Sequence, residues 1–209
     1  MTVITKPLTL VGMSNCGKTT LSLELQKLGY KRFFADSELI SELGLDGEED
    51  LANWLGLPYE DKYQKNSKLL LDLEAKITKK LLLDSLLCQN KGIKTVIDTS
   101  GSFAHAPDKL IKLIKKHSKI VYLGQHEEAF ETMFERFVKI KKALVCGNKI
   151  NFEVRKTEYE DTAWLKNKYS DLLTFRSLQY TNMADKIVYM DKFLDSNLTT
   201  KSFLESLFA

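Results

Sequence analysis

One segment near the start of the chain constrains its fold more than any other: it reads Gly12-Met13-Ser14-Asn15-Cys16-Gly17-Lys18-Thr19 and matches the pattern G-x-x-x-x-G-K-[ST]. Glycines let such a loop bend so that successive backbone N–H groups point inward at phosphate oxygens. The helix that follows presents its positive end to the same anion. The lysine reaches the terminal phosphates, and the last hydroxyl ligates Mg²⁺. The segment therefore predicts a site for ATP and Mg²⁺.

The residues on either side of this loop have the pattern that phosphate binding requires. Residues 8–11 form a short apolar run, which predicts a buried strand. Residues 18–28 carry leucines at the spacing of one helix face and are followed by Gly29. A glycine-rich turn without a ligand is the alternative interpretation. We expect the nucleotide to be bound by Gly12, Ser14, Asn15, Cys16, Gly17, Lys18, Thr19 and Thr20, with Lys18 also catalytic.

The rest of the chain alternates between short β-branched runs and helical patterns. Strands are predicted at 32–35, 95–97, 119–123 and 186–190, and helices at 37–90 (with breaks at Gly44, Gly47 and Gly56), 107–117, 127–142, 165–183 and the C-terminus. Such alternation predicts a three-layer α/β/α P-loop NTPase fold with a five-stranded parallel sheet. We find no repeat and no linker, so we expect a single domain over 1–209. Its substrate-binding helical region would span about 37–90, and a helical lid about 143–163.

Composition limits the class of protein. The chain has 209 residues, of which 44% are hydrophobic and 28% charged, and its net charge is only +3. This charge is too small to indicate nucleic acid or an acidic membrane as a partner. No run approaches the ~18 apolar residues of a membrane span, and the cysteines, Cys16, Cys88 and Cys146, are far apart and odd in number. These features predict a protein of the reducing cytoplasm, and the size of the chain makes a monomer the default expectation.

Two acidic residues follow predicted strands. Asp36 comes after residues 32–35, and Asp98 comes after residues 95–97. The carboxyl ends of parallel strands are where such sheets place their ligands. We therefore expect Thr19, Asp36 and Asp98 to form the metal site, with the two carboxylates orienting metal-bound water. Capping of the next helix, or closing of a turn, is the alternative role for either aspartate.

The segment Phe34-Ala35-Asp36-Ser37-Glu38-Leu39-Ile40 is similar to the D-x-D-x-x-I pattern of the shikimate kinase family, within the nucleoside-monophosphate-kinase-like group. In that family the first acid is associated with the metal site and the second with the substrate hydroxyls. The resemblance implies these roles for Asp36 and Glu38, which makes both candidate catalytic residues and Glu38 also a candidate base. Glutamate is one methylene longer than aspartate, which indicates a shifted or smaller substrate.

Two later segments extend the resemblance. Arg176-Ser177-Leu178-Gln179-Tyr180 with Ala184-Asp185 looks like the family's R-x-x-x-Y-x-x-x-A-D, in which the arginine clamps the substrate carboxylate. A guanidinium also matches a carboxylate bidentately on physical grounds. A surface arginine on an amphipathic helix is the alternative for Arg176. Residues 121–123 leading to Arg136 are similar to the strand and helix before the family's lid, which makes Arg136 a further candidate catalytic residue.

The sequence departs from the family at the substrate end. The glycine triplet after the third strand appears as Ser100-Gly101-Ser102, which we keep as candidate substrate-binding residues together with Glu38 and Arg176. The family's F-R-x-x-E appears as Leu70-Leu71-Asp72-Leu73-Glu74, without its arginine. The lid R-P is missing, and the lid region offers cations that could equally be a solvated face, namely Lys139, Lys141, Lys142 and Arg155.

These features together predict an ATP-dependent small-molecule kinase that transfers the γ-phosphate to a hydroxyl of a small, acidic metabolite. A GTPase is not indicated, because the nearest match to N-K-x-D ends in asparagine, at Asn151. Three alternatives stay open: a kinase for a sugar acid or nucleoside on the same scaffold, an ATP-binding regulatory protein that has lost phosphotransfer, and a nucleic-acid-associated ATPase.

Overall fold

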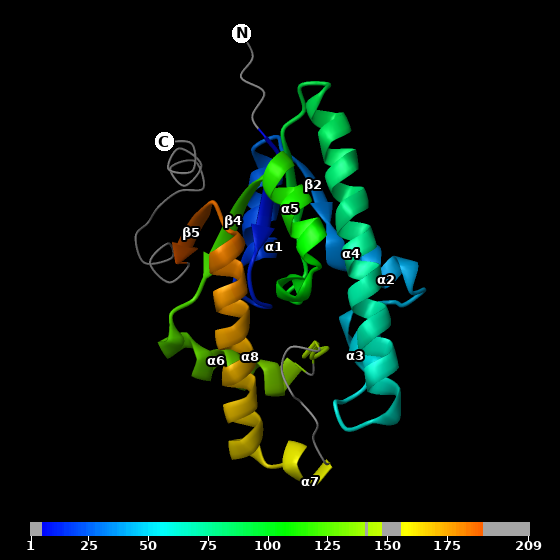
Figure 1. Ribbon diagram of the computed structural model, residues 1–209, viewed down its shortest axis with the longest axis vertical. Helices are drawn as coiled ribbons and strands as arrows, with labels where there is room; N and C mark the ends of the chain where they lie inside the picture. The colour runs from blue at the N-terminus through cyan, green and yellow to red at the C-terminus, as the bar shows by residue number, and fades with distance from the viewer. Residues whose placement is uncertain (1–5, 141, 148–155, 190–209) are drawn as a thin grey trace.

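The centre of the molecule is a five-stranded parallel sheet, seen in the computed structural model (Figure 1), which describes residues 6–140, 142–147 and 156–189. The strand order is β2-β3-β1-β4-β5, and every neighbouring pair is parallel. The predicted five-stranded parallel sheet is therefore confirmed. Its strands are β1 (Leu8–Val11), β2 (Lys31–Phe34), β3 (Thr95–Asp98), β4 (Lys119–Gly124) and β5 (Lys186–Tyr189).

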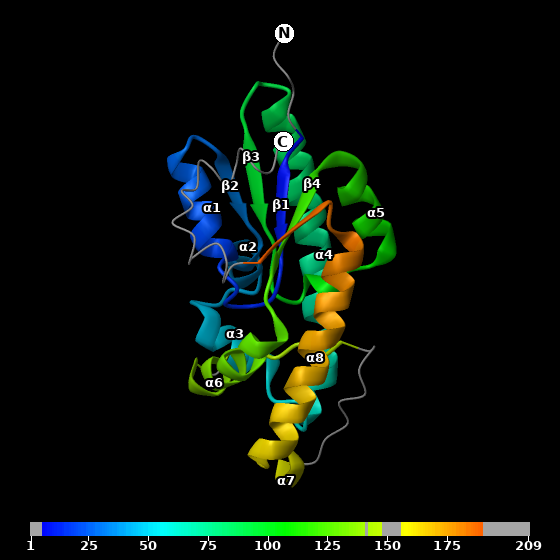
Figure 2. The ribbon, with the colours of Figure 1, turned by 90° about the vertical axis from the view of Figure 1, so that its left-hand side faces the viewer.

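Helices cover both faces of this sheet. Figure 2 shows α1 on one side and α4, α5 and α8 on the other, which confirms the three-layer arrangement. The described helices are α1 (Lys18–Lys27), α2 (Ala35–Glu42), α3 (Glu48–Leu55), α4 (Asp61–Gln89), α5 (Asp108–His117), α6 (Phe130–Ile140), α7 (Lys156–Tyr159) and α8 (Thr162–Met183), with short 3₁₀ turns η1 (Phe103–His105) and η2 (Glu127–Ala129).

The side chains of β1 alternate between the two layers of the core. Leu8 and Leu10 pack with residues of α1, whereas Val11 packs with the larger cluster on the opposite face. Successive residues of a strand point to opposite faces, so an apolar residue on each side is what a central strand requires. All four residues of β1 are fully buried. The loop that begins after Val11 therefore starts from a rigid part of the sheet.

The predicted helical region over 37–90 divides into three helices at its glycines. Gly44 and Gly56 have φ values of 65° and 81°, a left-handed conformation that glycine adopts without steric cost. The second strand ends one residue earlier than predicted, because Ala35 already begins α2. The helix predicted at the C-terminus lies outside the described residues.

The beginning of the predicted lid packs into the body of the molecule. Leu144, Val145 and Cys146 are buried in the main core cluster. The Tyr63 hydroxyl of α4 donates to the Leu144 carbonyl at 2.7 Å and accepts from the Cys146 N–H at 3.0 Å. In the rest of the predicted lid, residues 148–155 lie outside the described residues and α8 already begins at Thr162. A lid over 143–163 therefore stays a prediction. Its first residues are buried in the core in this structure.

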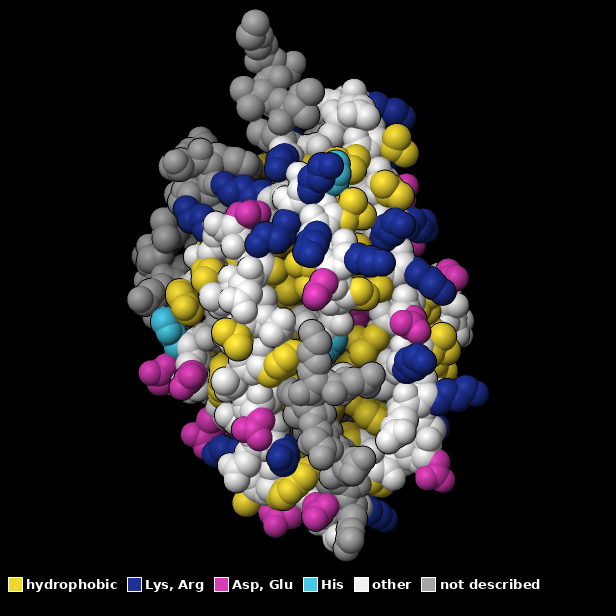
Figure 3. Space-filling model, in the orientation of Figure 1, with side chains coloured by type: hydrophobic (Ala, Val, Ile, Leu, Met, Phe, Trp, Pro, Cys, Tyr) yellow, Lys and Arg dark blue, Asp and Glu magenta, His cyan; other side chains and the backbone are white. Residues whose placement is uncertain are grey.

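The surface carries its lysines on the solvent sides of the helices. Figure 3 shows Lys and Arg side chains gathered over and around α5, which contributes the exposed residues Lys109, Lys112, Lys115 and Lys116. Leu110 and Ile114 on the inner side of the same helix are buried. None of the helices that the structure describes has the length and apolar character needed to cross a membrane.

Candidate active site

The loop between β1 and α1 has the backbone conformation that its glycines predict. Gly12 and Gly17 have φ values of 152° and 97°, and Asn15 is also left-handed at 64°. A Cβ atom added to Gly12 would lie 2.8 Å from the Leu123 carbonyl oxygen of β4, closer than real Cβ contacts allow. Only glycine therefore lets the loop pass this close to the neighbouring strand.

The amino end of α1 is open toward the loop. Gly17 caps the helix without a side-chain hydrogen bond, and the first turn contains no acidic residue. The free N–H groups and the positive end of the helix are therefore not neutralised by the helix itself. The Lys18 ammonium folds back and donates to the carbonyl oxygens of Gly12 and Met13, both at 2.8 Å. These groups fit an anion such as a triphosphate.

A cavity of about 480 Å³ lies against this loop, and six of the eight residues predicted to bind the nucleotide line it: Ser14, Asn15, Gly17, Lys18, Thr19 and Thr20. The other two, Gly12 and Cys16, are buried behind the loop. Cys16 packs with the α1 core, where burial raises the pKa of its thiol. The two residues thus shape the loop from inside, and the remaining lining comes from Asp36, Glu48, Gly101, Arg136, Ile140 and Lys142.

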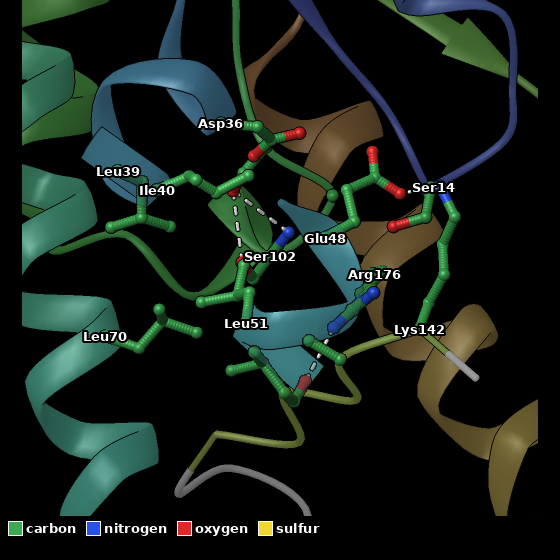
Figure 4. Close-up of a pocket in the computed structure, with 14 residues that line it drawn as sticks. Ser14, Asp36, Leu39, Ile40, Glu48, Leu51, Leu70, Ser102, Lys142 and Arg176 are labelled. Atoms are coloured by element: carbon green, nitrogen blue, oxygen red, sulfur yellow. Dashed lines mark hydrogen bonds and ion pairs between the residues drawn. The ribbon is translucent and has the colours of Figure 1, made fainter. Parts of the chain in front are cut away.

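A second, smaller cavity of about 70 Å³ adjoins the first (Figure 4). It is bounded by helices α2, α3, α4 and α8, by the turn after β3, and by the segment 142–147. The two cavities share five residues, of which Asp36 and Glu48 are carboxylates. The lining residues are Ser14, Asp36, Leu39, Ile40, Glu48, Leu51, Leu70, Ser100, Gly101, Ser102, Lys142, Ala143, Val145 and Arg176.

Asp36 lies in the first turn of α2 and lines both cavities. Burial raises the pKa of its carboxyl group to about 6. Lys18 and Lys142 act against this rise, whereas Asp98 and Glu48 add to it. A carboxyl group with a pKa near 6, placed between two cavities, is suited to exchange a proton near neutral pH.

Glu38 corrects a prediction made from the family pattern. It is exposed, lines neither cavity, and forms an ion pair with Lys80 of α4 at 3.1 Å. The reason is helical geometry: residues two apart on a helix point about 200° apart, so Asp36 and Glu38 of α2 cannot face the same cavity. The structure therefore does not support Glu38 as a substrate-binding residue or base.

Asp98 ends β3 as predicted, but its carboxylate has structural partners. One oxygen accepts from Arg32 at 2.9 Å and from the Ser22 hydroxyl at 2.8 Å, and the other is buried without a described partner. Asp98 lines neither cavity. The ion pair with Arg32 links β2 to β3, and the hydrogen bond from Ser22 links α1 to β3. The metal role of Asp98 stays a prediction.

Arg176 reaches the second cavity from α8. Its side chain is buried and lines the second cavity, so Arg176 is not the surface arginine of the alternative interpretation. Nη2 donates to the Val145 carbonyl at 2.6 Å, and Nε is buried with no hydrogen-bond partner among the described residues. A buried guanidinium N–H without an acceptor costs free energy, and the residue that carries it lines the second cavity. The geometry fits the predicted contact with an anionic group.

The turn after β3 contains a buried cluster of Glu74, Ser100 and Ser102. Both serine hydroxyls donate to the Glu74 carboxyl group, the one from Ser102 at 2.8 Å, and the two hydroxyls lie 3.0 Å apart. Burial raises the pKa of Glu74 to about 8, while the hydrogen bond from Ser102 lowers it. Gly101 between the serines touches the loop: an added Cβ would lie 2.8 Å from the Ser14 nitrogen.

Sequence reasoning did not assign Glu74 to the site. The signal in the sequence is that Glu74 occupies the glutamate position of the segment that resembles F-R-x-x-E. The pairing with the serines depends on contact between α4 and the turn after β3. Glu74 is 26 residues from Ser100 and 28 residues from Ser102 in the sequence.

The cations Lys142 and Arg136 line the cavity of the phosphate-binding loop. Lys142 also lines the second cavity and forms an ion pair with Glu48 of α3 at 2.9 Å. Arg136 of α6 is exposed. Within the described ranges, no group of three or more His, Cys, Asp or Glu residues could hold a metal ion. A bound Mg²⁺ would therefore depend on Thr19, a carboxylate and the nucleotide itself.

The parallel sheet, its strand order and the loop after β1 define a P-loop NTPase fold. Solved structures with this fold include shikimate kinases. The enzyme from Acinetobacter baumannii, solved with shikimate, has a TM-score of 0.60 and 20% identity, and the alignment covers 98% of this chain and 90% of that one. The enzyme from Aquifex aeolicus has a TM-score of 0.60 and 17% identity, with 97% and 94% covered.

A third shikimate kinase, from Bacteroides thetaiotaomicron, has a TM-score of 0.50 and 18% identity over 88% of this chain and 86% of its own. The predicted likeness to the shikimate kinase fold is thus confirmed. No protein-family model matches the sequence, and no curated protein is significantly similar to it. The activity must therefore be argued from the site.

Proposed function

We propose that the protein is an ATP-dependent kinase that transfers the γ-phosphate of ATP to a hydroxyl of a small, acidic metabolite. One observation carries the proposal: the cavity of the phosphate-binding loop adjoins a second cavity, and Ser14, Asp36 and Gly101 line both. Phosphoryl transfer needs a donor and an acceptor held in line across such a junction. The shared fold with shikimate kinases supports the same conclusion.

The donor end of the site would hold ATP through the loop backbone. The N–H groups of the loop and of the first turn of α1 would bind the phosphates, and Lys18 would exchange its present bonds to loop carbonyls for phosphate oxygens. Thr19 is the exposed hydroxyl next to Lys18 and would ligate Mg²⁺. When bound, Mg²⁺ supplies charge neutralisation at the phosphates.

The acceptor end would be organised by Asp36 and Arg176. Arg176 would bind the acidic group of the acceptor, and the Asp36 carboxylate would accept the proton of its hydroxyl. The pKa of Asp36, about 6, leaves it mostly ionised at neutral pH and still able to take up a proton. Lys142 and Arg136 are placed to stabilise the negative charge that spreads over the transferred group.

The test is a coupled assay of ADP release with Mg²⁺ and ATP against hydroxylated acids, sugars and nucleosides, with a control that lacks an acceptor. We expect release that depends on an acidic acceptor and that falls by at least about 10²-fold in Lys18→Ala. Lys27→Ala, at an exposed position of the same helix, is the matched control. Unchanged turnover in Lys18→Ala would contradict the proposal.

A protein that binds ATP without transferring it is the second candidate. It is favoured by the replacement of two glycines by Ser100 and Ser102, which fill part of the acceptor cavity and are bonded to Glu74. ATP binding with no acceptor-dependent ADP release in the same assay would support this candidate over the kinase.

A further inference from the structure

We propose that the acceptor is a small hydroxy acid with a single negative charge and a largely apolar body. The proposal rests on the kinase function proposed above and narrows its substrate class. It is carried by three properties of the second cavity among the described residues: a lining cation without an ion pair, an aliphatic wall, and the position of the polar groups at its border with the loop.

The charged residues that line the cavity are Asp36, Glu48, Lys142 and Arg176. Among the described residues its cations are Arg176 and Lys142, and Lys142 is already paired with Glu48 at 2.9 Å. Arg176 has no ion pair with a described carboxylate, and its buried Nε has no hydrogen-bond partner. One acidic group would satisfy this guanidinium. A second acidic group would be buried without a counter-charge, which is strongly unfavourable.

The wall beside this cation is aliphatic. Leu39 and Ile40 of α2, Leu51 of α3 and Leu70 of α4 line the cavity, and the segment 142–147 adds Ala143 and Val145. Figure 4 shows Leu39, Ile40 and Leu70 on the side of α2 and α4, and Leu51 of α3 nearer the centre of the view. Their side chains offer no hydrogen-bonding group. A ring hydroxyl held against this wall would lose its water without a partner, whereas a CH₂ group would gain from burial.

The remaining polar side chains divide into two sets. Ser100 and Ser102 donate their hydroxyl hydrogens to Glu74, so neither has a hydrogen left to donate to a ligand. Ser14 and Asp36 lie at the border with the phosphate-binding loop, whereas Arg176 lines only the second cavity. A ligand would therefore place its acid at Arg176 and the reactive hydroxyl at Asp36, with an apolar body between them.

The experiment is equilibrium binding by titration calorimetry to the full chain, in the presence of a non-hydrolysable ATP analogue and Mg²⁺. The probes are shikimate, a cyclohexane carboxylate with one ring hydroxyl, the primary amide of that compound, and a cyclohexane dicarboxylate. We expect the mono-hydroxy acid to bind about tenfold more tightly than each of the other three, because each adds an unpaired polar group or removes the charge. Tighter or equal binding of shikimate or of the dicarboxylate would overturn the inference, as would no binding of the mono-hydroxy acid.

A variant pair tests the wall directly. Ile40→Asn adds hydrogen-bonding groups to the cavity and should shift the ratio of affinities toward shikimate by about three- to tenfold. Leu43→Asn, at a partly buried position of the same segment that does not line the cavity, is the control and should leave the ratio unchanged. Circular dichroism of both variants checks folding. An unchanged ratio in a folded Ile40→Asn would contradict a wall that selects against hydroxyls.

The two proposals fail separately. Shikimate that binds best and also stimulates ADP release would leave the kinase proposal standing and remove this inference. Failure of the ATP analogue to bind would remove the kinase proposal, whichever acid binds.

Discussion

Glu74 shows how the burial of one side chain links stability to pH. Burial raises its pKa from the usual 4.5 to about 8, so the folded state binds this proton more tightly than the unfolded chain. The associated stability is fully present below pH 4.5 and is lost as the pH rises through about 8. Over this pH range we expect the free energy of unfolding of the wild type to fall by roughly 3–5 kcal/mol relative to that of Glu74→Gln.

Urea unfolding of the two proteins between pH 5 and 9 measures this difference. The matched control is Glu38→Gln, because Glu38 is exposed and its carboxylate is paired only at the surface. Parallel stability curves for the wild type and Glu74→Gln would mean that Glu74 is ionised in the folded protein throughout the range.

Asp36 should control the acid limb of the activity profile. We expect Asp36→Asn to lower kcat by about 10²–10⁴-fold while ATP still binds, because an amide cannot accept the hydroxyl proton. In the wild type, activity should fall as the pH drops below about 6, where Asp36 becomes protonated. Kinetics from pH 5 to 8 measure both effects. If the activity of Asp36→Asn still falls below about pH 6, the fall is caused by another titratable group.

Among the elements, α4 holds the segment 142–147 over the acceptor cavity. The Tyr63 hydroxyl makes two hydrogen bonds to this segment, to Leu144 and Cys146. Tyr63→Phe leaves a buried carbonyl and N–H without this partner, which should cost about 1–3 kcal/mol. Chemical denaturation measures the loss. Tyr59→Phe, on a partly exposed ring that contacts Tyr159, should stay within about 0.5 kcal/mol of the wild type.

The elements themselves were largely predictable from local patterns, and the site was predictable only in part. Six of the predicted loop residues between Ser14 and Thr20 line the first cavity, and the sequence could indicate them because the motif is contiguous; their binding of a nucleotide stays a prediction. Glu38 was misassigned because a linear pattern does not reveal which side of α2 faces the cavity. The partners of Ser100 and Asp98 depend on side chains from α4 and β2 that only tertiary packing brings together.

At the scale of the whole molecule, we expect the chain to unfold as one unit that ATP stabilises. A non-hydrolysable analogue at about 100 times its dissociation constant should add about 2.7 kcal/mol, which raises Tm by roughly 5–10 °C for a chain of this size. Lys18→Ala should lose most of this shift. Thermal scans by circular dichroism and tryptophan fluorescence measure it, and transitions that differ between the two probes would contradict a single domain.

The wall shared by the two cavities would couple the two proposed ligands to one another. Ser14, Asp36, Glu48, Gly101 and Lys142 line both, so a molecule in either cavity alters the surroundings of its neighbour. Binding linkage is reciprocal: the factor by which the acceptor changes the affinity for ATP equals the factor by which ATP changes the affinity for the acceptor. If the proposed kinase activity holds, a site completed only when the acceptor is bound would also limit the hydrolysis of ATP by water.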